Sequence, residues 1–161
     1  MIFNSDIFLL FFSVVILLYW LVRNNQGHRD WLILISSFLF YGTWDWRFLG
    51  LLVLTGGIDF VSAYKISISN NPTEKKRWLM LSIISNLGTL GFFKYAGFFL
   101  ESTFHLLEML GIPSTRPVLA IVLPAGISFY TFQALSYTLD VYRGQIKVES
   151  DPVKYFAFLT F

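Results

Sequence analysis

The sequence predicts an all-α protein, a polytopic bundle of transmembrane helices, and its composition and apolar patterning carry that prediction. Of the 161 residues, 55% are hydrophobic, 19% are aromatic and only 14% are charged. Soluble domains carry about 25% charged residues and about 45–50% apolar ones. The apolar residues also form long continuous blocks rather than the single stripe of an amphipathic helix, which is typical of helices surrounded by lipid.

The apolar blocks predict about five membrane crossings. Several blocks are shorter than the roughly 20 residues that cross a bilayer, so their helices would thin the bilayer or depend on flanking anchors. All five tryptophans lie at block ends, as expected of interfacial aromatic side chains. The predicted crossings are residues 7–22, 31–46, 48–64, 78–99 and 118–142, within one domain, 1–161, that we expect to be incomplete.

The connections between the blocks hold most of the charge. Residues 43–47 predict a tight turn and residues 65–77 a polar loop, while residues 101–110 predict a short interfacial helix before a break at Gly111 and Pro113. An outside N-terminus leaves nine of the 12 Lys and Arg residues in the cytoplasm, as the positive-inside rule favours. These nine are Arg23, Arg29, Lys65, Lys75, Lys76, Arg77, Arg143, Lys147 and Lys154.

Several classes of site are missing from the sequence. The absence of cysteine excludes a disulfide framework, a thiolate metal site and a cysteine nucleophile. No phosphate loop, zinc motif or dinucleotide fingerprint occurs, so we expect no metal and no bound cofactor. A net charge of +2 is too small to predict nucleic-acid binding, and the expected surroundings are membrane lipid. The first block lacks a preceding basic residue and a cleavage pattern, which predicts a retained helix.

The last block, residues 118–142, and the residues just after it hold the candidate site. Pro124 lacks a backbone donor, and Gly126 lacks a side chain, so that a ligand or another backbone can approach. Lipid does not satisfy polar side chains, so those that follow should face protein, a cavity or a substrate. Helix packing through small and hydroxyl residues is the alternative explanation for each residue taken singly. The channel- or substrate-lining candidates are Ser128, Tyr130, Gln133, Tyr137, Asp140 and Arg143.

Short strings of residues in this region resemble those of a known family. They are Leu123-Pro124, Gly126 to Gln133, Ser136-Tyr137 and Asp140 to Gly144, with weaker agreement at residues 3–5, 40–45, 86–88 and 93–96. On these strings the chain resembles the N-terminal portion of the membrane-bound O-acyltransferases (MBOAT), in the branch that O-acetylates alginate and peptidoglycan. The resemblance implies the N-terminal part of a ring-like helical bundle that encloses a channel.

The resemblance also implies an enzyme, an O-acyltransferase and most simply an O-acetyltransferase. Such an enzyme passes an acyl group from a cytoplasmic thioester, acetyl-CoA or a related donor, across the membrane towards an extracellular polysaccharide such as alginate or peptidoglycan. The implied location is the cell (inner) membrane, with several crossings, and the implied partners are the acyl donor and a separate extracytoplasmic acetyltransferase. Arg143 would either meet a donor phosphate or pair with Asp140.

The family's essential histidine belongs to a downstream stretch, so the resemblance places the catalytic histidine beyond Phe161. His28 and His105 match no catalytic motif and are expected to be exposed. We therefore expect no catalytic residue within the chain and no activity from it alone.

Two polar residues inside the blocks leave other functions open. Asp59 is either a functional carboxylate or the partner of a neighbouring helix, and Asn86 is expected to bond across helices. With Pro124 and Gly126, Asp59 would suit the broken-helix site of a membrane transporter or channel. A non-catalytic membrane assembly subunit is the remaining alternative.

Overall fold

The computed structural model describes residues 6–110, 124 and 126–160, and the regular secondary structure in these ranges is entirely helical. The all-α class is therefore confirmed. The helices are α1 (Asp6–Val22), α2 (Gln26–Ile68), α3 (Pro72–Met109), α4 (Ile127–Tyr142) and α5 (Pro152–Thr160). Two segments, Asp45–Ile68 of α2 and the whole of α3, are long and apolar enough to cross a membrane, and α1 is a shorter apolar helix. The five crossings and their order stay a prediction.

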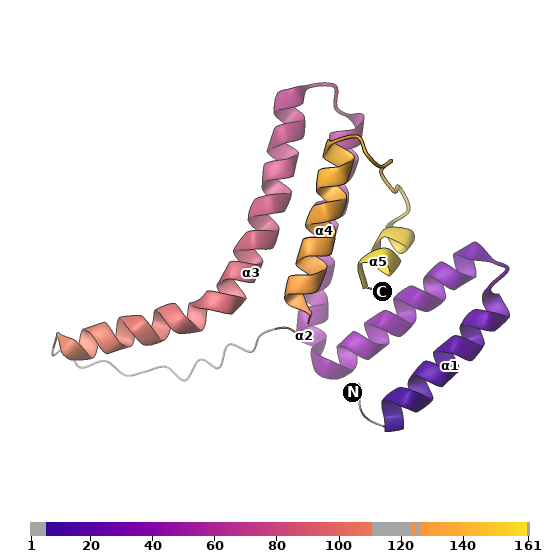
Figure 1. The fold of residues 1–161 in the computed structure, drawn as a ribbon, viewed down its shortest axis with the longest axis horizontal. Helices are drawn as coiled ribbons and strands as arrows, with labels where there is room; N and C mark the ends of the chain where they lie inside the picture. The colour runs from indigo at the N-terminus through magenta and orange to yellow at the C-terminus, as the bar shows by residue number, and fades with distance from the viewer. Residues whose placement is uncertain (1–5, 111–123, 125, 161) are drawn as a thin grey trace.

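The second helix, α2, bends sharply at Asp45, which has extended backbone angles of φ −160° and ψ 113°. Its Oδ1 accepts a hydrogen bond from the backbone N–H of Arg47 at 3.0 Å, and its Oδ2 lies 2.8 Å from Nη2 of Arg47. This is the geometry of a helix N-cap. The two arms of α2 consequently form a V (Figure 1). The reversal predicted for residues 43–47 is made by a capped kink.

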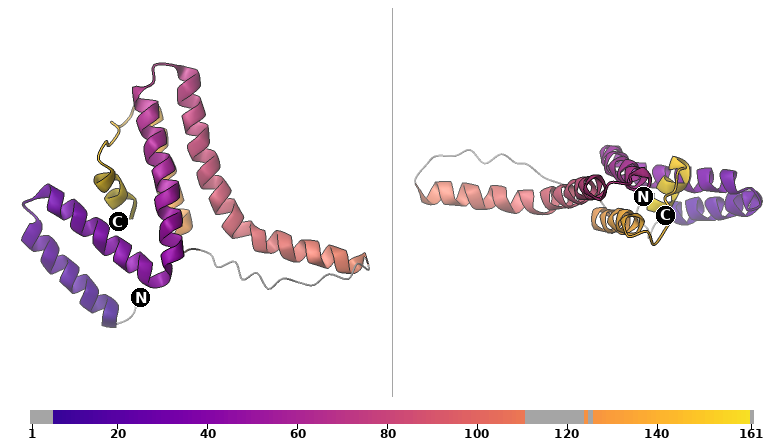
Figure 2. Two further views of the ribbon diagram at one scale, coloured as in Figure 1. Left: turned by 180° about the vertical axis from the view of Figure 1, so that it is seen from behind. Right: turned by 90° about the horizontal axis from the view of Figure 1, so that it is seen from above.

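Three helices stand side by side: the second arm of α2, the first half of α3 and α4 (Figures 1 and 2). The connection from α2 to α3 is short because α3 begins immediately, with Pro72 at its first position and Asn71 Oδ1 accepting from Thr73 N–H at 2.9 Å. The second half of α3 turns away from the other two helices (Figure 1). The residues predicted to form a short interfacial helix are helical, but residues 101–109 continue α3 instead of starting a helix of their own, and their interfacial location stays a prediction.

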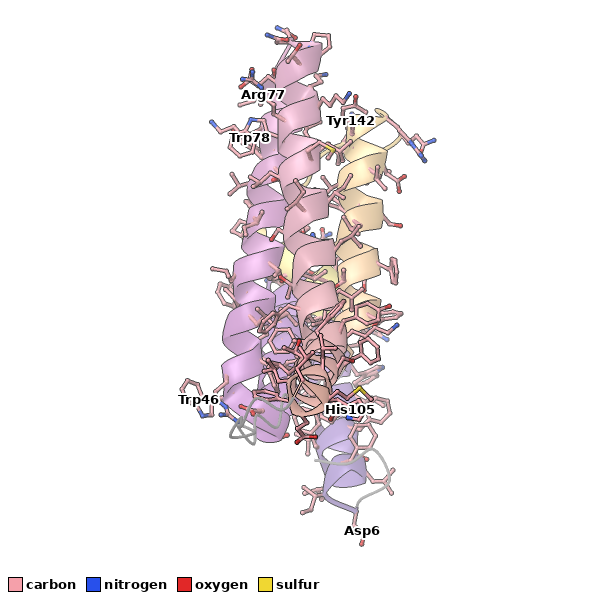
Figure 3. The ribbon with its side chains drawn as sticks, turned by 90° about the vertical axis from the view of Figure 1, so that its left-hand side faces the viewer. Asp6, Trp46, Arg77, Trp78, His105 and Tyr142 are labelled. Carbon is pink, nitrogen blue, oxygen red and sulfur yellow. The ribbon has the colours of Figure 1, made fainter. Side chains whose placement is uncertain are left out.

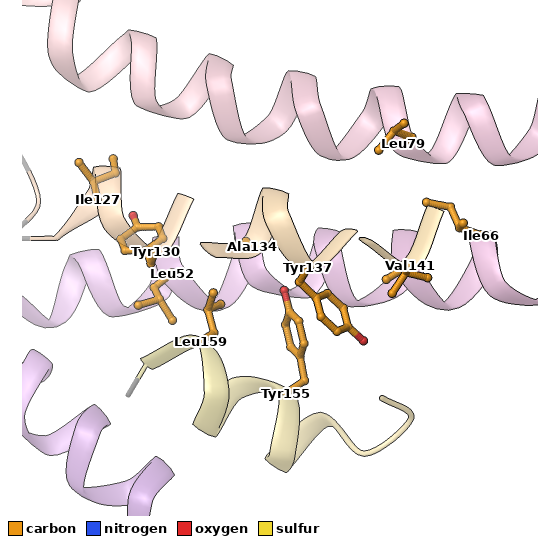
Figure 4. Packing of buried hydrophobic residues seen from close by; sticks show 11 residues of the cluster. Leu52, Ile66, Leu79, Ile127, Tyr130, Ala134, Tyr137, Val141, Tyr155 and Leu159 are labelled. Atoms are coloured by element: carbon orange, nitrogen blue, oxygen red, sulfur yellow. The ribbon is translucent and has the colours of Figure 1, made fainter. Parts of the chain in front are cut away.

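The core lies on the face of α4 that meets α2 and α3. Buried positions on α4 recur every three or four residues, which is the period of a helix face. They meet Leu52 and Ile66 of α2, Leu79 of α3 and Leu159 of α5 in one cluster (Figure 4). The buried α4 residues are Ile127, Tyr130, Thr131, Ala134, Leu135, Tyr137, Thr138 and Val141.

The short helix α5 lies inside the V of α2 and packs closely on it (Figure 1). Gly56 permits the contact, because a Cβ there would lie 2.7 Å from Cδ2 of Leu159 and 2.9 Å from a ring carbon of Phe156. A Cβ on the neighbouring Gly57 would meet nothing within 4 Å. The position of α5 therefore depends on the missing side chain at residue 56.

The first helix, α1, has no buried residue and packs only on α2 among the described helices. The contact includes Phe8 and Phe40, whose ring centroids are 5.5 Å apart. The predicted crossing 7–22 lies in α1, those at 31–46 and 48–64 lie in α2, and that at 78–99 lies in α3. Residues 118–123 and 125 of the last predicted crossing lie outside the described residues.

Candidate functional site

An open groove of about 840 Å³ runs along α4 beside α5, and four of the six candidate residues line it. Gln133, Tyr137 and Asp140 follow one another at spacings of four and three residues, so that α4 presents them on one face, and Ser128 lies at another edge of the groove. The aromatic walls of the groove come from Phe129 and Phe132 of α4 and from Phe158 of α5, and Ser136 and Ile146 complete the lining.

Gln133 joins the groove to α5. Its Nε2 donates a hydrogen bond to the backbone oxygen of Phe158 at 2.7 Å. Its Oε1 is buried and has no hydrogen-bond partner in the described part of the chain. A buried acceptor without a partner costs free energy, so a donor from a ligand would be favoured there. The amide nitrogen of Gln133 thus fixes the side chain at the groove wall, with its unpaired oxygen buried behind the groove surface.

Tyr137 forms part of the groove wall and also holds the α4–α5 connection in place. Its hydroxyl oxygen accepts a hydrogen bond from the backbone N–H of Glu149 at 2.8 Å. Its ring packs against Tyr155 of α5, with ring centroids 5.1 Å apart (Figure 4). The hydroxyl is thus used within the protein, and what Tyr137 presents to the groove is its ring.

Tyr130 and Arg143, the other two candidates, lie outside this groove. Tyr130 is only 5% exposed and packs in the core beside Ile127 and Leu52 (Figure 4). Its hydroxyl lacks a partner among the described residues. Arg143 follows the last residue of α4 and lines a second groove at that end of the helix. The described residues contain no ion pair between Asp140 and Arg143.

A polar cluster that is fully buried joins α2 to α3. Asn86 Nδ2 donates to both oxygens of Asp59, at 2.8 and 2.7 Å, and Ser82 Oγ donates to Oδ1 at 2.5 Å. Asp59 and Ser82 are 0% exposed, and Asn86 is 1% exposed. The expectation that Asn86 bonds across helices is confirmed. Asp59 is hydrogen-bonded to the neighbouring helix α3, as one of its two predicted roles required. Hydrogen bonds of this kind are what a carboxylate needs where water is excluded.

The two histidines belong neither to the groove along α4 nor to the buried polar cluster of α2 and α3. His28 is exposed in the first turn of α2, rather than in a loop, and His105 is exposed on the second half of α3. Figure 3 places His105 at the end of the bundle opposite to Tyr142. In residues 6–110, 124 and 126–160, no group of three or more His, Asp or Glu side chains could hold a metal ion.

The sequence pattern identified the α4 side of the groove but not its opposite wall. Phe158 and Ile146 were missed because they belong to an apolar run and to a connection with no distinctive residue type. Ser82 was also missed, although its spacing of four from Asn86 places both on one face of α3. That spacing was the signal that could have identified the third member of the buried cluster.

Comparison with known proteins gives matches over nearly the whole chain. This chain is 36% identical over 163 aligned residues to a probable alginate O-acetylase AlgI of Pseudomonas aeruginosa. It is 35% identical to the probable alginate O-acetylase AlgI of Pseudomonas syringae pv. tomato. Each match covers 99% of this chain and 30% of the relative. A peptidoglycan O-acetyltransferase of Helicobacter pylori is 35% identical over 148 residues, which is 89% of this chain and 27% of the relative.

No family model and no solved structure matches the chain. The chain spans about 30% of the length of the curated relatives it matches. The names of these relatives support an O-acetyltransferase family, and the apolar helices are consistent with a membrane protein.

Proposed function

We propose that this chain is part of a multi-pass membrane O-acetyltransferase of the MBOAT type. In this proposal the enzyme passes an acetyl group from a cytoplasmic thioester, acetyl-CoA or a related donor, towards an extracellular polysaccharide such as alginate or peptidoglycan. The reaction class is supported by relatives named alginate O-acetylase and peptidoglycan O-acetyltransferase. Placement in the cell (inner) membrane is supported by the two candidate spans and by the exposed apolar surface of α1.

The observation that carries the proposal is the groove along α4, because the residues with the strongest family resemblance line it. Acyl transfer to a hydroxyl needs a site that holds a short apolar acyl group and orients a polar acceptor. Phe129, Phe132 and Phe158 supply apolar walls, whereas Asp140, with Ser128 and Ser136, supplies polar groups that can bond an acceptor hydroxyl. In the proposed enzyme this groove becomes part of the channel wall.

The catalytic histidine is proposed to lie outside these 161 residues, and the chain alone is proposed to be inactive. Support comes from the family resemblance and from the matched relatives, of which the chain spans about 30%. A separate extracytoplasmic acetyltransferase is the proposed partner. A transporter, a channel or a non-catalytic assembly subunit is not favoured, because the matched relatives are named for acetyl transfer.

The groove can be tested by blocking it, because the chain has no native cysteine. Ser136→Cys places a thiol in the groove, and Ser102→Cys places one on exposed α3 outside it. In the full-length protein, we expect a bulky maleimide at residue 136 to lower transfer of labelled acetyl by about tenfold or more, since small displacements of reacting groups have effects of that size. The same reagent at residue 102 should leave transfer within about twofold.

Equal transfer from the two labelled variants would exclude the groove from the acyl path. The role of the histidine is tested separately, with labelled thioester and membranes that hold either this chain alone or the full-length protein. Activity of the chain alone that disappears with His28→Ala or His105→Ala would overturn the proposal that the catalytic histidine lies elsewhere.

A further inference from the structure

A second groove, of about 650 Å³, opens where the α2–α3 connection meets the α4–α5 connection. Three cationic side chains line it, Lys75 of α3 with Arg143 and Lys147 of the segment after α4, and no acidic residue does. Within the described residues none of the three makes an ion pair or a side-chain hydrogen bond. Three like charges around one hollow repel one another, so the groove is suited to an anion that comes from outside the chain.

Helix stability does not explain Lys75. It lies in the first turns of α3, where the positive end of the helix dipole disfavours a cation. It is also half-buried, whereas its neighbour Lys76 is exposed. A lysine that is partly desolvated at an unfavourable helix end, and that lines one groove with two exposed cations, is stabilised when a negative group enters the groove.

The two cations after α4 are held by a preformed turn. Gly144 has φ +71°, and its N–H donates to the oxygen of Val141 at 3.0 Å. The N–H of Gln145 donates to the oxygen of Asp140 at 2.9 Å, which completes the Schellman pattern of a helix end. This turn fixes how the chain leaves α4 between Arg143 and Lys147, so their backbone positions exist before any ligand binds.

The surroundings of the groove indicate the source of the anion. Trp78 and Tyr142 lie at the same end of the bundle as Arg77, whereas Trp46 and His105 lie at the other end (Figure 3). Aromatic side chains of this kind mark membrane interfaces, and a surplus of Lys and Arg marks the cytoplasmic side. The groove also has apolar walls from Ile66, Ile146 and Val148. Cationic and apolar groups together match a lipid at the level of its headgroup.

We propose that this groove binds the headgroup phosphate of an anionic phospholipid at the cytoplasmic face of the membrane. Lys75, Arg143 and Lys147 donate charge-assisted hydrogen bonds to the phosphate oxygens. The proposal rests on the membrane placement and orientation proposed above and is independent of acetyl transfer.

The test compares two triple variants that lose the same charge. One removes the groove cations, as Lys75→Gln, Arg143→Gln and Lys147→Gln. The control removes three cations that do not line the groove, as Lys65→Gln, Lys76→Gln and Lys154→Gln. Each protein is purified in neutral detergent and titrated with short-chain phosphatidylglycerol, with phosphatidylcholine of the same chain length and with inorganic pyrophosphate. Tryptophan fluorescence reports the thermal midpoint, and a carbonate wash of the source membranes checks insertion separately.

We expect phosphatidylglycerol to raise the midpoint of the parent protein and to bind the groove variant at least about tenfold more weakly, since several charge-assisted bonds are lost. The control variant should bind within about threefold of the parent. If both triple variants bind phosphatidylglycerol equally weakly, the binding is general charge attraction, and the proposal of a specific site is overturned. Stabilisation by pyrophosphate that phosphatidylglycerol does not match would overturn the lipid source, and an equal response to phosphatidylcholine would overturn selectivity for an anionic headgroup.

Discussion

Both carboxylate oxygens of Asp59 accept hydrogen bonds from the single amide nitrogen of Asn86, 27 residues further along the chain. The two side chains belong to neighbouring helices, and each is at most 1% exposed. The interaction therefore joins α2 to α3 at a depth that water does not reach, with Ser82 as its third member.

Asn86→Leu should destabilise the protein by about 3 kcal/mol, because it leaves the buried Asp59 carboxylate with Ser82 as its remaining donor. The double variant Asp59→Leu/Asn86→Leu should lose less than the sum of the two single variants, because it removes the carboxylate together with its amide donor and leaves only the Ser82 hydroxyl without its acceptor. Reversible unfolding in mixed detergent micelles measures all four proteins of this cycle. Asn70→Leu, at an exposed position, is the control for the substitution itself. Strict additivity would show that the two side chains do not interact.

Gly56→Ala should loosen the contact between α2 and α5, because the new methyl group would lie 2.7 Å from Cδ2 of the buried Leu159. Overpacking of this size costs about 1–3 kcal/mol. Gly57→Ala is the matched control, since its methyl group meets nothing within 4 Å and alanine favours the helix. Unfolding midpoints and protease sensitivity of residues 145–160 should distinguish the two variants. A Gly56→Ala protein as stable as Gly57→Ala would mean that α5 is not packed in the V.

Asp45→Ala should destabilise the second arm of α2, whereas Asp45→Asn should be nearly neutral. Asparagine can still accept from the N–H of Arg47 as an N-cap, but alanine cannot. The ion pair with Arg47 should contribute little, because the Arg47 side chain is 70% exposed. A fall of a few degrees in the thermal midpoint is expected for the alanine variant. If asparagine proves as harmful as alanine, the ion pair is what stabilises the kink.

A cysteine at the α2–α3 connection should face the cytoplasm, because this orientation keeps nine of the 12 basic residues inside. Asn70→Cys is the better probe, since the side chain of Asn71 caps α3. A membrane-impermeant thiol reagent added to intact cells should leave residue 70 unmodified until the membrane is opened. Ser102→Cys, on the second half of α3, should react from outside. The reverse labelling pattern would invert the topology and place the basic groove outside.

Apolar blocks in the sequence located the helices better than they located the helix ends. The third block ends at Tyr64, yet α2 continues to Ile68 and stops where Ser69 and Asn71 begin the cap of α3. Hydrophobicity falls where a helix meets polar surroundings, but a helix ends where its backbone is capped. The charge of Glu101 likewise does not end α3. The helix continues past this residue because no Pro or Gly interrupts residues 98–109.

The polar residues of the candidate site were predictable one by one, but their partners were not. Helical spacing predicts that Gln133, Tyr137 and Asp140 share one face of the helix, because positions within a helix are fixed by local geometry. Contacts between helices depend on how two helices are aligned, and no local rule determines that alignment. This is why the bonds from Gln133 to Phe158 and from Tyr137 to Glu149 required the structure.

The Asp59–Asn86 contact also limits how α2 and α3 can slide along each other. Two apolar helices side by side in a membrane have several alignments of similar packing energy, and neighbouring alignments differ by one turn, about 5.4 Å. A shift of one turn would break the two hydrogen bonds from Asn86 to Asp59 and leave a carboxylate unpaired. The short connection from Ser69 to Asn71 joins the two helices directly. The hairpin of α2 and α3 can therefore select its own alignment and present a defined surface on which α4 and α5 then pack.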